Sequence, residues 1–349
     1  MSLVTTWLKI KNNPVNTNRW AQFKNNKRGY WSLWIFLILF SLSLVAELWI
    51  NDKPIMVSYQ QKWYFPIVED VPETQLGGDF DITTDYSDPY MIEQIEKNGW
   101  ILWPLVPFYY DSINFELTEP APSPPSNINY LGTDDQGRDL LARLVYGFRI
   151  STLFALTLTF FSSVIGIALG AIQGYYGGRI DLFGQRLLEI WEGLPMLFML
   201  IILASFVEPT FFWLLGLMIL FSWPSLVSVV RAEFLRGRHL EYVKAATALG
   251  VSDRKIMFKH ILPNAMIATL TFMPYLFTGA LTTLTSLDFL GFGLPLGSAS
   301  LGEMVAQGKD NLQAPWLAIT AFISLSTILV LLVFIGEAAR DAFDPRKSL

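Results

Sequence analysis

Six long apolar runs constrain the fold of this chain more than any other feature of its sequence. An α-helix rises about 1.5 Å per residue, so roughly 20 apolar residues in helical form cross a hydrocarbon layer about 30 Å thick. With 52% hydrophobic and only 16% charged residues, the sequence is too apolar for an ordinary soluble domain. We therefore expect an all-α integral membrane protein with six transmembrane helices. The runs are residues 31–50, 150–173, 187–206, 210–230, 265–287 and 317–336.

The distribution of basic residues predicts which helix ends face the cytoplasm. Lysine and arginine are enriched on the cytoplasmic side of membrane proteins. Here they concentrate in residues 1–30 and 231–264, whereas the second and third connections expected outside together hold only Lys309. Both termini are therefore predicted to be cytoplasmic. The first run, residues 31–50, has no small-residue cleavage site after it, so we expect a retained signal anchor.

Residues 51–147 form a long acidic segment that is expected outside the cytoplasm. The segment contains sixteen acidic and five basic residues, and enough aromatic side chains for a small core of its own. Its proline-rich part, residues 119–125, is expected to be extended rather than helical. Two interpretations remain open: an acidic surface that contacts a substrate-delivery protein or a cationic substrate, and a solvated insertion without a partner.

The end of this segment predicts a short helix before the second apolar run. Thr133 and Gln136 have the spacing of a capping box. Apolar residues then recur at helical spacing, which predicts an amphipathic helix on the outer face of the membrane. These residues are Leu140, Leu141, Leu144 and Val145.

Residues 231–264 place a helix, a glycine, a second helix and a proline between two apolar runs. The first helix is expected to begin near Glu241 and to end at Gly250, because glycine adopts positive φ without a steric penalty. Ser252 is the expected N-cap of the second helix and Pro263 its expected end. The loop carries seven basic and three acidic residues, which any cytoplasmic loop would explain. The helix-glycine-helix order instead predicts a surface for a partner.

The loop resembles the E-A-A loop of ATP-binding-cassette (ABC) importer permeases, in which E-A-A and a later glycine precede I-x-L-P. Lys244 stands where that pattern has Glu, and His260 where it has Ile. Residues 131–143 resemble the LGTD-x-x-GRD-x-x-x-R element of oligopeptide and dipeptide importer permeases, and residues 287–295 resemble their L-x-F-L-G-x-G-x-x-P element. The long first outside segment makes the resemblance closest to the microcin C and oligopeptide permease branch. The loop positions that match are Ala245, Ala246, Gly250, Leu262 and Pro263.

The resemblance implies a type I ABC importer permease fold, with an extracytoplasmic insertion after the first helix. It implies a translocating subunit, rather than an enzyme, that moves oligopeptides or peptide-like compounds such as microcin C inward by alternating access. The implied partners are a second permease subunit, two ATP-binding subunits, an extracytoplasmic substrate-binding protein and membrane lipid, without nucleic acid. A phosphate-binding loop G-x-x-x-x-G-K-[ST] is missing from the sequence, since Gly308 and Lys309 are followed by Asp310. ATP and Mg are therefore expected on the partner subunits.

The resemblance also implies which residues carry the function. We expect this chain to contain no catalytic, cofactor-binding or metal-binding residues. Pro224 and Pro274 lie within apolar runs, and two interpretations stay open: they kink the helices and line the transport path, or they are prolines tolerated in a packed bundle. The expected ATPase-coupling residues are Glu241, Lys244, Ala245, Ala246, Gly250, Ser252, Asp253, Ile261, Leu262 and Pro263.

These expectations divide the chain into consecutive parts of a multi-pass protein of the bacterial inner membrane. The parts are a basic cytoplasmic N-terminus (1–30), the signal-anchor helix (31–50), the acidic extracytoplasmic segment (51–147), a five-helix permease core (148–336) that contains the coupling loop (231–264), and a cytoplasmic tail (337–349).

Two other classes of membrane protein agree less well with the sequence. A membrane-embedded hydrolase needs a general base at membrane depth, but the only histidines, His239 and His260, lie in the coupling loop. An ion-coupled secondary transporter often uses ionisable groups at mid-membrane. The candidate acids here are expected near the ends of the spans, which disfavours that class. They are Glu47, Glu189, Glu192, Glu208 and Asp288.

Overall fold

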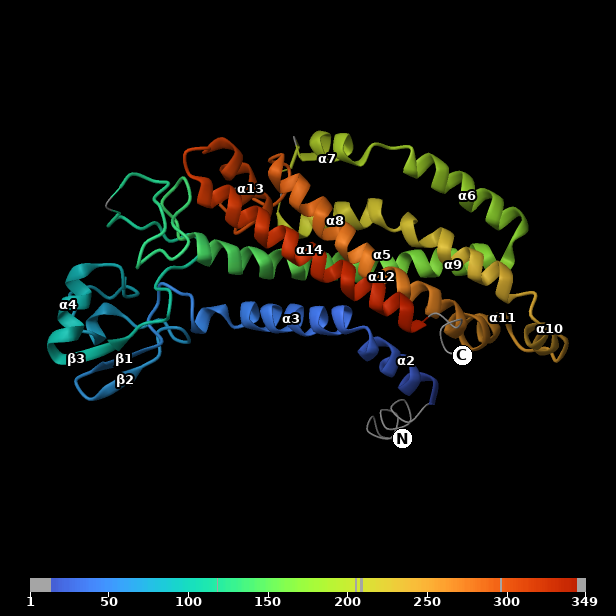
Figure 1. Ribbon diagram of the computed structural model, residues 1–349, viewed down its shortest axis with the longest axis horizontal. Coiled ribbons are helices and arrows are strands. Elements are labelled where there is room, and N and C mark those ends of the chain that lie inside the picture. Colours follow the sequence, from blue (N-terminus) through green and yellow to red (C-terminus); the bar gives the residue numbers. More distant parts are fainter. Residues whose placement is uncertain (1–13, 118, 205, 208–209, 296, 344–349) are drawn as a thin grey trace.

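A computed structural model describes residues 14–117, 119–204, 206–207, 210–295 and 297–343. Residues 1–13 of the basic N-terminus, residues 344–349 of the tail, and Glu208 therefore lie outside the described part of the chain. Four long helices run side by side and form the body of the molecule (Figure 1). They are α3 (Lys27–Leu44), α5 (Leu140–Tyr176), α12 (Leu262–Phe289) and α14 (Pro315–Phe343).

The two ends of this bundle carry different structures (Figure 1). A small sheet and α4 (Pro89–Asn98) occupy one end. The opposite end carries α10 (Glu241–Ala248) and α11 (Asp253–Lys255), and α2 (Pro14–Asn25) and the last turns of α14 point the same way. The chain thus separates the acidic insertion from the basic loop by the full length of the bundle.

Four helical segments are long and apolar enough to cross a membrane. They are Leu140–Tyr176, Phe211–Gly237, Asp253–Phe289 and Pro315–Phe343, and each covers all but at most one residue of a predicted apolar run. The segment Phe211–Gly237 consists of α8 (Phe211–Ser222) and α9 (Pro224–Gly237). The first predicted run corresponds to α3, which begins at Lys27 and ends at Leu44, before a short 3₁₀ turn at Ala46–Leu48. The count of six transmembrane helices therefore stays a prediction.

The third predicted run, 187–206, is not one continuous helix. It is divided between α6 (Gly178–Glu192) and α7 (Met196–Ala204). The backbone N–H of Gly193 still donates to Glu189, but Pro195 has no N–H to continue the ladder and disfavours helical geometry at the residue before it. The apolar composition concealed this break, because hydropathy does not report hydrogen bonding.

The insertion contains a three-stranded antiparallel sheet, so the expectation of an all-α chain is wrong for this segment. The strands are β1 (Met56–Tyr59), β2 (Lys62–Tyr64) and β3 (Gly99–Leu102), in the order β2-β1-β3. Tyr59 pairs with Lys62 across a two-residue turn, in which Gln60 and Gln61 both have positive φ, 48° and 64°. Hairpin turns of this kind usually carry Asn or Gly. Glutamines at both positions gave no turn signal in the sequence.

The prediction that the insertion builds its own core is confirmed. One face of the sheet packs with α4 and the 3₁₀ turn Glu73–Gln75 around a buried cluster. Asp88 caps α4 by accepting a hydrogen bond from the backbone N–H of Tyr90. Aromatic residues on the other face, Trp63 and Trp100, remain exposed. The cluster comprises Val57, Tyr59, Val71, Leu76, Tyr86, Met91 and Ile95.

The predicted capping box before the second run is wrong. The Thr133 hydroxyl accepts a hydrogen bond from the backbone N–H of Ser123, on the preceding strap of chain, and does not cap a helix. The cap of α5 is Asp139, whose carboxylate accepts from the N–H of Ala142 at 2.8 Å. From Leu140, α5 continues without a break into the apolar run, so a separate helix on the outer face does not form. Residues 119–125 are non-helical, as predicted.

Glycines permit the close approach of α5 and α9. Gly166, Gly170 and Gly174 recur every fourth residue, which places them on one face of α5. A Cβ added to Gly170 would lie 2.7 Å from the carbonyl oxygen of Val227, and one added to Gly174 would lie 2.6 Å from that of Arg231. The two helices therefore pack backbone against backbone, as small-xxx-small faces do in membrane proteins.

Candidate functional site

The predicted coupling loop forms a short helix held against the bundle by its apolar face. In α10, Val243 and Ala246 are buried in a cluster with Phe234 of α9 and Ile256. Ile261, in the π-helical turn η3 (Ile256–Ile261), belongs to the same cluster. Thus two of the predicted coupling residues, Ala246 and Ile261, hold the loop in place and do not face solvent. The exposed ones are Glu241, Lys244, Ala245, Gly250, Ser252, Asp253 and Pro263.

The turn after α10 has the predicted glycine conformation. Gly250 adopts φ +74°, and its N–H donates to the carbonyl of Thr247. The N–H of Val251 donates to the carbonyl of Ala246 at 3.1 Å. These two bonds form a Schellman motif, which satisfies the last carbonyls of the helix. Ser252 precedes α11 as predicted, but its hydroxyl makes no capping hydrogen bond.

Pro263 does not end the second helix, contrary to the sequence-based expectation. A continuous helical segment runs from Asp253 through η3 into α12. In the π-helical turn the hydrogen bonds reach one residue further back, so the N–H of Leu262 donates to Met257. Pro263 then falls in the first turn of α12, where its missing N–H costs little. The coupling loop is therefore joined rigidly to a predicted transmembrane helix.

The exposed face of α10 carries one acidic and one basic side chain and is therefore nearly neutral. Lys244, at the position where the family has Glu, lies 3.1 Å from the Glu241 carboxylate, one helical turn earlier. Both side chains are exposed, which makes the pair a weak contribution to stability. The Tyr175 hydroxyl of α5 donates to Asp253 at 2.7 Å and fixes the start of α11. Glu241 thus presents an acid on the same face of α10 as Lys244, one helical turn before the position where the family has Glu.

A partly buried ion pair fixes α6 against α9 near this loop. The guanidinium of Arg231 donates to both carboxylate oxygens of Asp181, with Nη2 at 2.7 Å from Oδ2. The hydrogen bond from Arg231 holds the pKa of the Asp181 carboxyl below its usual value of 3.8. The two parallel hydrogen bonds fix the orientation of α6 relative to α9, in addition to pairing the two charges.

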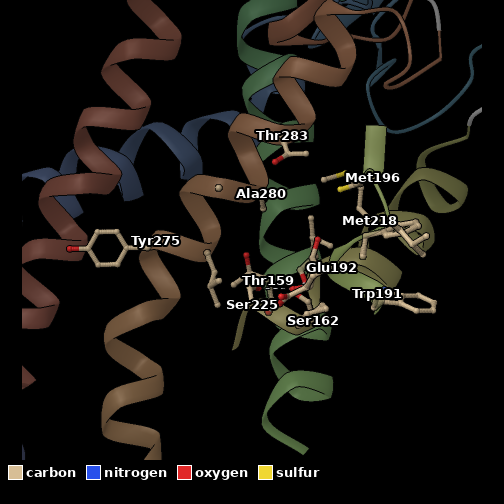
Figure 2. Close-up of a pocket in the computed structure, with 17 residues that line it drawn as sticks. Thr159, Ser162, Trp191, Glu192, Met196, Met218, Ser225, Tyr275, Ala280 and Thr283 are labelled. Carbon is tan, nitrogen blue, oxygen red and sulfur yellow. Dashed lines mark hydrogen bonds between the residues drawn. The ribbon is translucent and has the colours of Figure 1, made fainter. Parts of the chain in front are cut away.

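A cavity of about 440 Å³ opens between α5, α6, α8, α9 and α12 (Figure 2). Thr159 and Ser162 of α5 line it, with Ser225 of α9 and Thr283 of α12. Of the two prolines predicted along the path, Pro224 lines this cavity at the start of α9. Pro274 does not line it: it packs toward α14, where a Cβ on Gly336 would lie 3.2 Å away.

Glu192 also lines the cavity, which differs from the expectation that it lies near the end of a span. The chain break after α6 places this residue opposite Leu158 and Ser162, which lie about halfway along α5. Sequence reasoning missed this position because it assumed one helix over 187–206. The Gly193-Leu194-Pro195 tripeptide was the available signal.

At the end of the bundle opposite α10, residues 131–143 and a later helix meet in a buried ionic network. Arg138 and Arg143 come from residues 131–143, and Glu303 comes from α13 (Leu301–Asp310). Nη2 of Arg143 lies 3.1 Å from Glu303 and 3.0 Å from the carbonyl of Ser298. Asp134 pairs with Arg138 at 2.6 Å and is fully buried. This network ties the insertion to the bundle.

A second acid near this network is held close to the backbone. The Asp139 carboxylate, besides capping α5, accepts a hydrogen bond from the Asn129 amide at 2.9 Å. Burial raises the pKa of Asp139 above its usual value, against the lowering effect of these hydrogen bonds. The Asp139 carboxylate and the Asn129 amide together fix the non-helical segment that precedes α5.

Residues 166–349 match the family described as binding-protein-dependent transport system inner membrane component. The chain belongs to this family, and it is therefore a multi-pass integral membrane permease subunit of an ABC importer, a transport protein rather than an enzyme. The matched region contains the coupling loop, the cavity-lining parts of α6 to α12, and Glu303.

Individual relatives extend the similarity over nearly the whole chain. The sequence is 60% identical over 336 residues to the inner membrane ABC transporter permease protein YejE of Escherichia coli (strain K12), which covers 96% of this chain and 98% of the relative. It is 53% identical to the peptidoglycan transport system permease protein YejE of Agrobacterium fabrum, with 96% and 94% covered. The oligopeptide transport system permease protein OppC of Lactococcus lactis subsp. lactis is 34% identical, with 65% and 78% covered. The ion-coupled transporter and hydrolase hypotheses receive no support from these matches.

Proposed function

We propose that this permease subunit imports peptide-like compounds, including oligopeptides, peptidoglycan fragments and conjugates such as microcin C. The name of one relative that matches nearly the full chain refers to peptidoglycan transport, and the name of another that matches a shorter part refers to oligopeptide transport. The observation that carries the mechanism is α10, a short helix that is anchored by Val243 and Ala246 and exposes small residues at one end of the bundle. A partner protein can approach such a surface closely.

The proposed topology has six transmembrane segments in a type I permease arrangement. α3 is the first segment, and the interrupted run 187–206, divided between the end of α6 and α7, is the third. The others are the apolar segments Leu140–Tyr176, Phe211–Gly237, Asp253–Phe289 and Pro315–Phe343. Both termini and α10 are assigned to the cytoplasm, and the insertion to the outside. This assignment is supported by the basic residues of the coupling loop and by the location of the sheet at the opposite end.

Two ATP-binding subunits, which carry ATP and Mg, are the proposed partners of α10 and of its equivalent on a second permease subunit. When the ATPases close on nucleotide, they displace the coupling helices. Because the helical segment Asp253–Phe289 is continuous, displacement of α11 moves α12 directly. The cavity beside α12 then alternates between outward and inward access, a two-state change driven by differential binding. The proposed source of substrate is an extracytoplasmic binding protein.

The experiment is peptide uptake and ATP hydrolysis by the co-expressed complex in proteoliposomes, with Ala245→Leu in place of the wild type. Ala245 is exposed, so leucine is accommodated by this chain alone and clashes only with a docked partner. We expect ATP hydrolysis to continue while uptake falls at least about tenfold, because the coupling contact is displaced. Lys259→Leu, at another exposed position of the same loop, is the control and should transport normally.

Equal uptake by wild type and Ala245→Leu would refute the coupling role of α10. Failure of the wild-type complex to take up any peptide, in the presence of its binding protein and ATP, would refute the proposed substrate class.

A further inference from the structure

The cavity in Figure 2 has the position expected for a ligand that crosses the membrane. Leu158, Thr159 and Ser162, near the middle of α5, line it. Several residues between Tyr275 and Thr283, in the middle and second half of α12, line it as well. Both helices belong to segments that are long and apolar enough to span a membrane. The cavity therefore lies at about half the depth of the bundle.

One carboxylate stands among otherwise uncharged lining residues. Glu192 is the only charged side chain among the described residues that line the cavity, and it has no ion-pair partner in the described part of the chain. Glu189, one turn earlier on α6, is by contrast paired with Arg186. An ionisable residue at membrane depth is costly and generally has a functional partner. The Glu192 side chain is exposed in this chain, so a cationic ligand in the cavity can reach it.

The surroundings of Glu192 favour a cation further. Glu192 is the last residue of α6, so the negative end of the helix dipole points into the same region. Trp191 also lines the cavity, and its ring is fixed by a hydrogen bond from Nε1 to the carbonyl of Leu220 at 2.9 Å and by stacking on Phe221. A positioned indole face attracts ammonium groups.

The buried hydroxyl of Thr159, beside the cavity, lacks a hydrogen-bond partner among the described residues. Thr159 is only 8% exposed, and its Oγ1 makes no hydrogen bond within the described residues. The neighbouring hydroxyls are already used, since Ser162 donates to Leu158 at 2.5 Å and Ser225 to Ser222 at 2.6 Å. Because the Thr159 oxygen has almost no accessible surface, Thr159 borders the cavity without offering its hydroxyl to a ligand there.

We propose that this cavity binds the protonated amino group of the transported substrate, with Glu192 as its counter-charge and Trp191 as a cation–π surface. The inference rests on the proposed import of peptide-like compounds and names the chemical group that the permease itself selects. The free α-amino group of a peptide fits this arrangement. The remaining lining is uncharged, so substrate side chains are not selected by charge.

The test compares uptake of one peptide in two forms, with a free and with an acetylated amino terminus, by the whole complex in proteoliposomes. Wild type is expected to import the free-amine form at least about tenfold faster, which is the lower end of the effect of one charge-assisted hydrogen bond. In Glu192→Gln, uptake of the free-amine form should fall to that of the acetylated form. Glu189→Gln is the matched control on the same helix and should keep the wild-type ratio.

The comparison within one complex separates the permease from the binding protein, because every variant uses the same binding protein. An unchanged ratio in Glu192→Gln overturns the inference while leaving the proposed import of peptides intact. Loss of the second permease subunit from purified Glu192→Gln complex also overturns it, since Glu192 would then pair with that subunit. If wild type imports neither form, the proposed function itself fails.

Discussion

Nη2 of Arg143 lies 3.1 Å from the Glu303 carboxylate, with the arginine side chain fully buried. Arg143 belongs to α5 and Glu303 to α13, so the contact joins two segments that are far apart in the chain. The guanidinium also donates to the carbonyls of Tyr110 and Ser298. The pair therefore fixes the insertion, α5 and the segment after α12 relative to one another.

Removal of one member of this network should destabilise the protein strongly. Arg143→Met removes a fully buried guanidinium that pairs with the buried carboxylate of Asp134 as well as with Glu303, and loss of one partner of a buried pair costs about 3 kcal/mol or more. We expect a lower unfolding temperature of the detergent-purified complex and loss of assembled complex. Arg186→Gln, which removes an exposed pair, should leave the unfolding temperature nearly unchanged. Equal unfolding temperatures for both variants would show that the network is not important for stability.

Replacement of Gly250 should uncouple transport according to backbone conformation rather than side-chain size. The space around this residue is open, but its φ of +74° costs a β-branched residue about 1–2 kcal/mol. Gly250→Val should therefore distort the turn after α10 and reduce peptide uptake relative to ATP hydrolysis. Gly250→Asn, which tolerates positive φ, should retain most uptake. If valine and asparagine behave alike, the turn conformation does not matter for coupling.

A larger residue at Gly170 should separate α5 from α9. The nearest backbone atom, the Val227 carbonyl oxygen, would lie 2.7 Å from an added Cβ, so Gly170→Leu forces the helices apart at a cost of about 1–3 kcal/mol. The expected result is a reduced yield and a lower unfolding temperature. Gly216→Ala is the control, because open space surrounds Gly216 in α8 and alanine favours a helix by about 1 kcal/mol. A normal yield and unfolding temperature for Gly170→Leu would contradict the close packing.

The Asp181–Arg231 pair predicts a pH dependence of stability. The pKa of Asp181 is lowered in the folded protein, so its stabilising effect is present above the unfolded value of 3.8 and is lost as the pH falls through the lower folded value. The difference in unfolding temperature between wild type and Asp181→Asn should therefore be constant above about pH 5 and shrink in more acidic buffer. Asp70→Asn, which alters an exposed pair, should show a smaller difference throughout. A wild-type advantage that grows on acidification would contradict this assignment.

Local signals in the sequence predicted the helices and turns that depend on nearby residues. The apolar run 150–173 lies within α5, and the glycine turn at Gly250 has the expected conformation. Errors arose where hydrogen bonding competed with these signals. Pro263 was expected to end a helix, but a π-helical turn accommodates it, and hydropathy did not register the break at Pro195.

By itself, the sequence determined that the chain is a membrane protein, where its loop of two short helices lies, and which family it resembles. These properties follow from helical period, apolar length and turn chemistry, which act over a few residues. Tertiary structure alone decided that Arg143 meets Glu303 and that Glu192 lines a cavity beside Thr159. Such contacts join residues that are distant in the chain, and they depend on how whole helices pack, which local patterns do not encode.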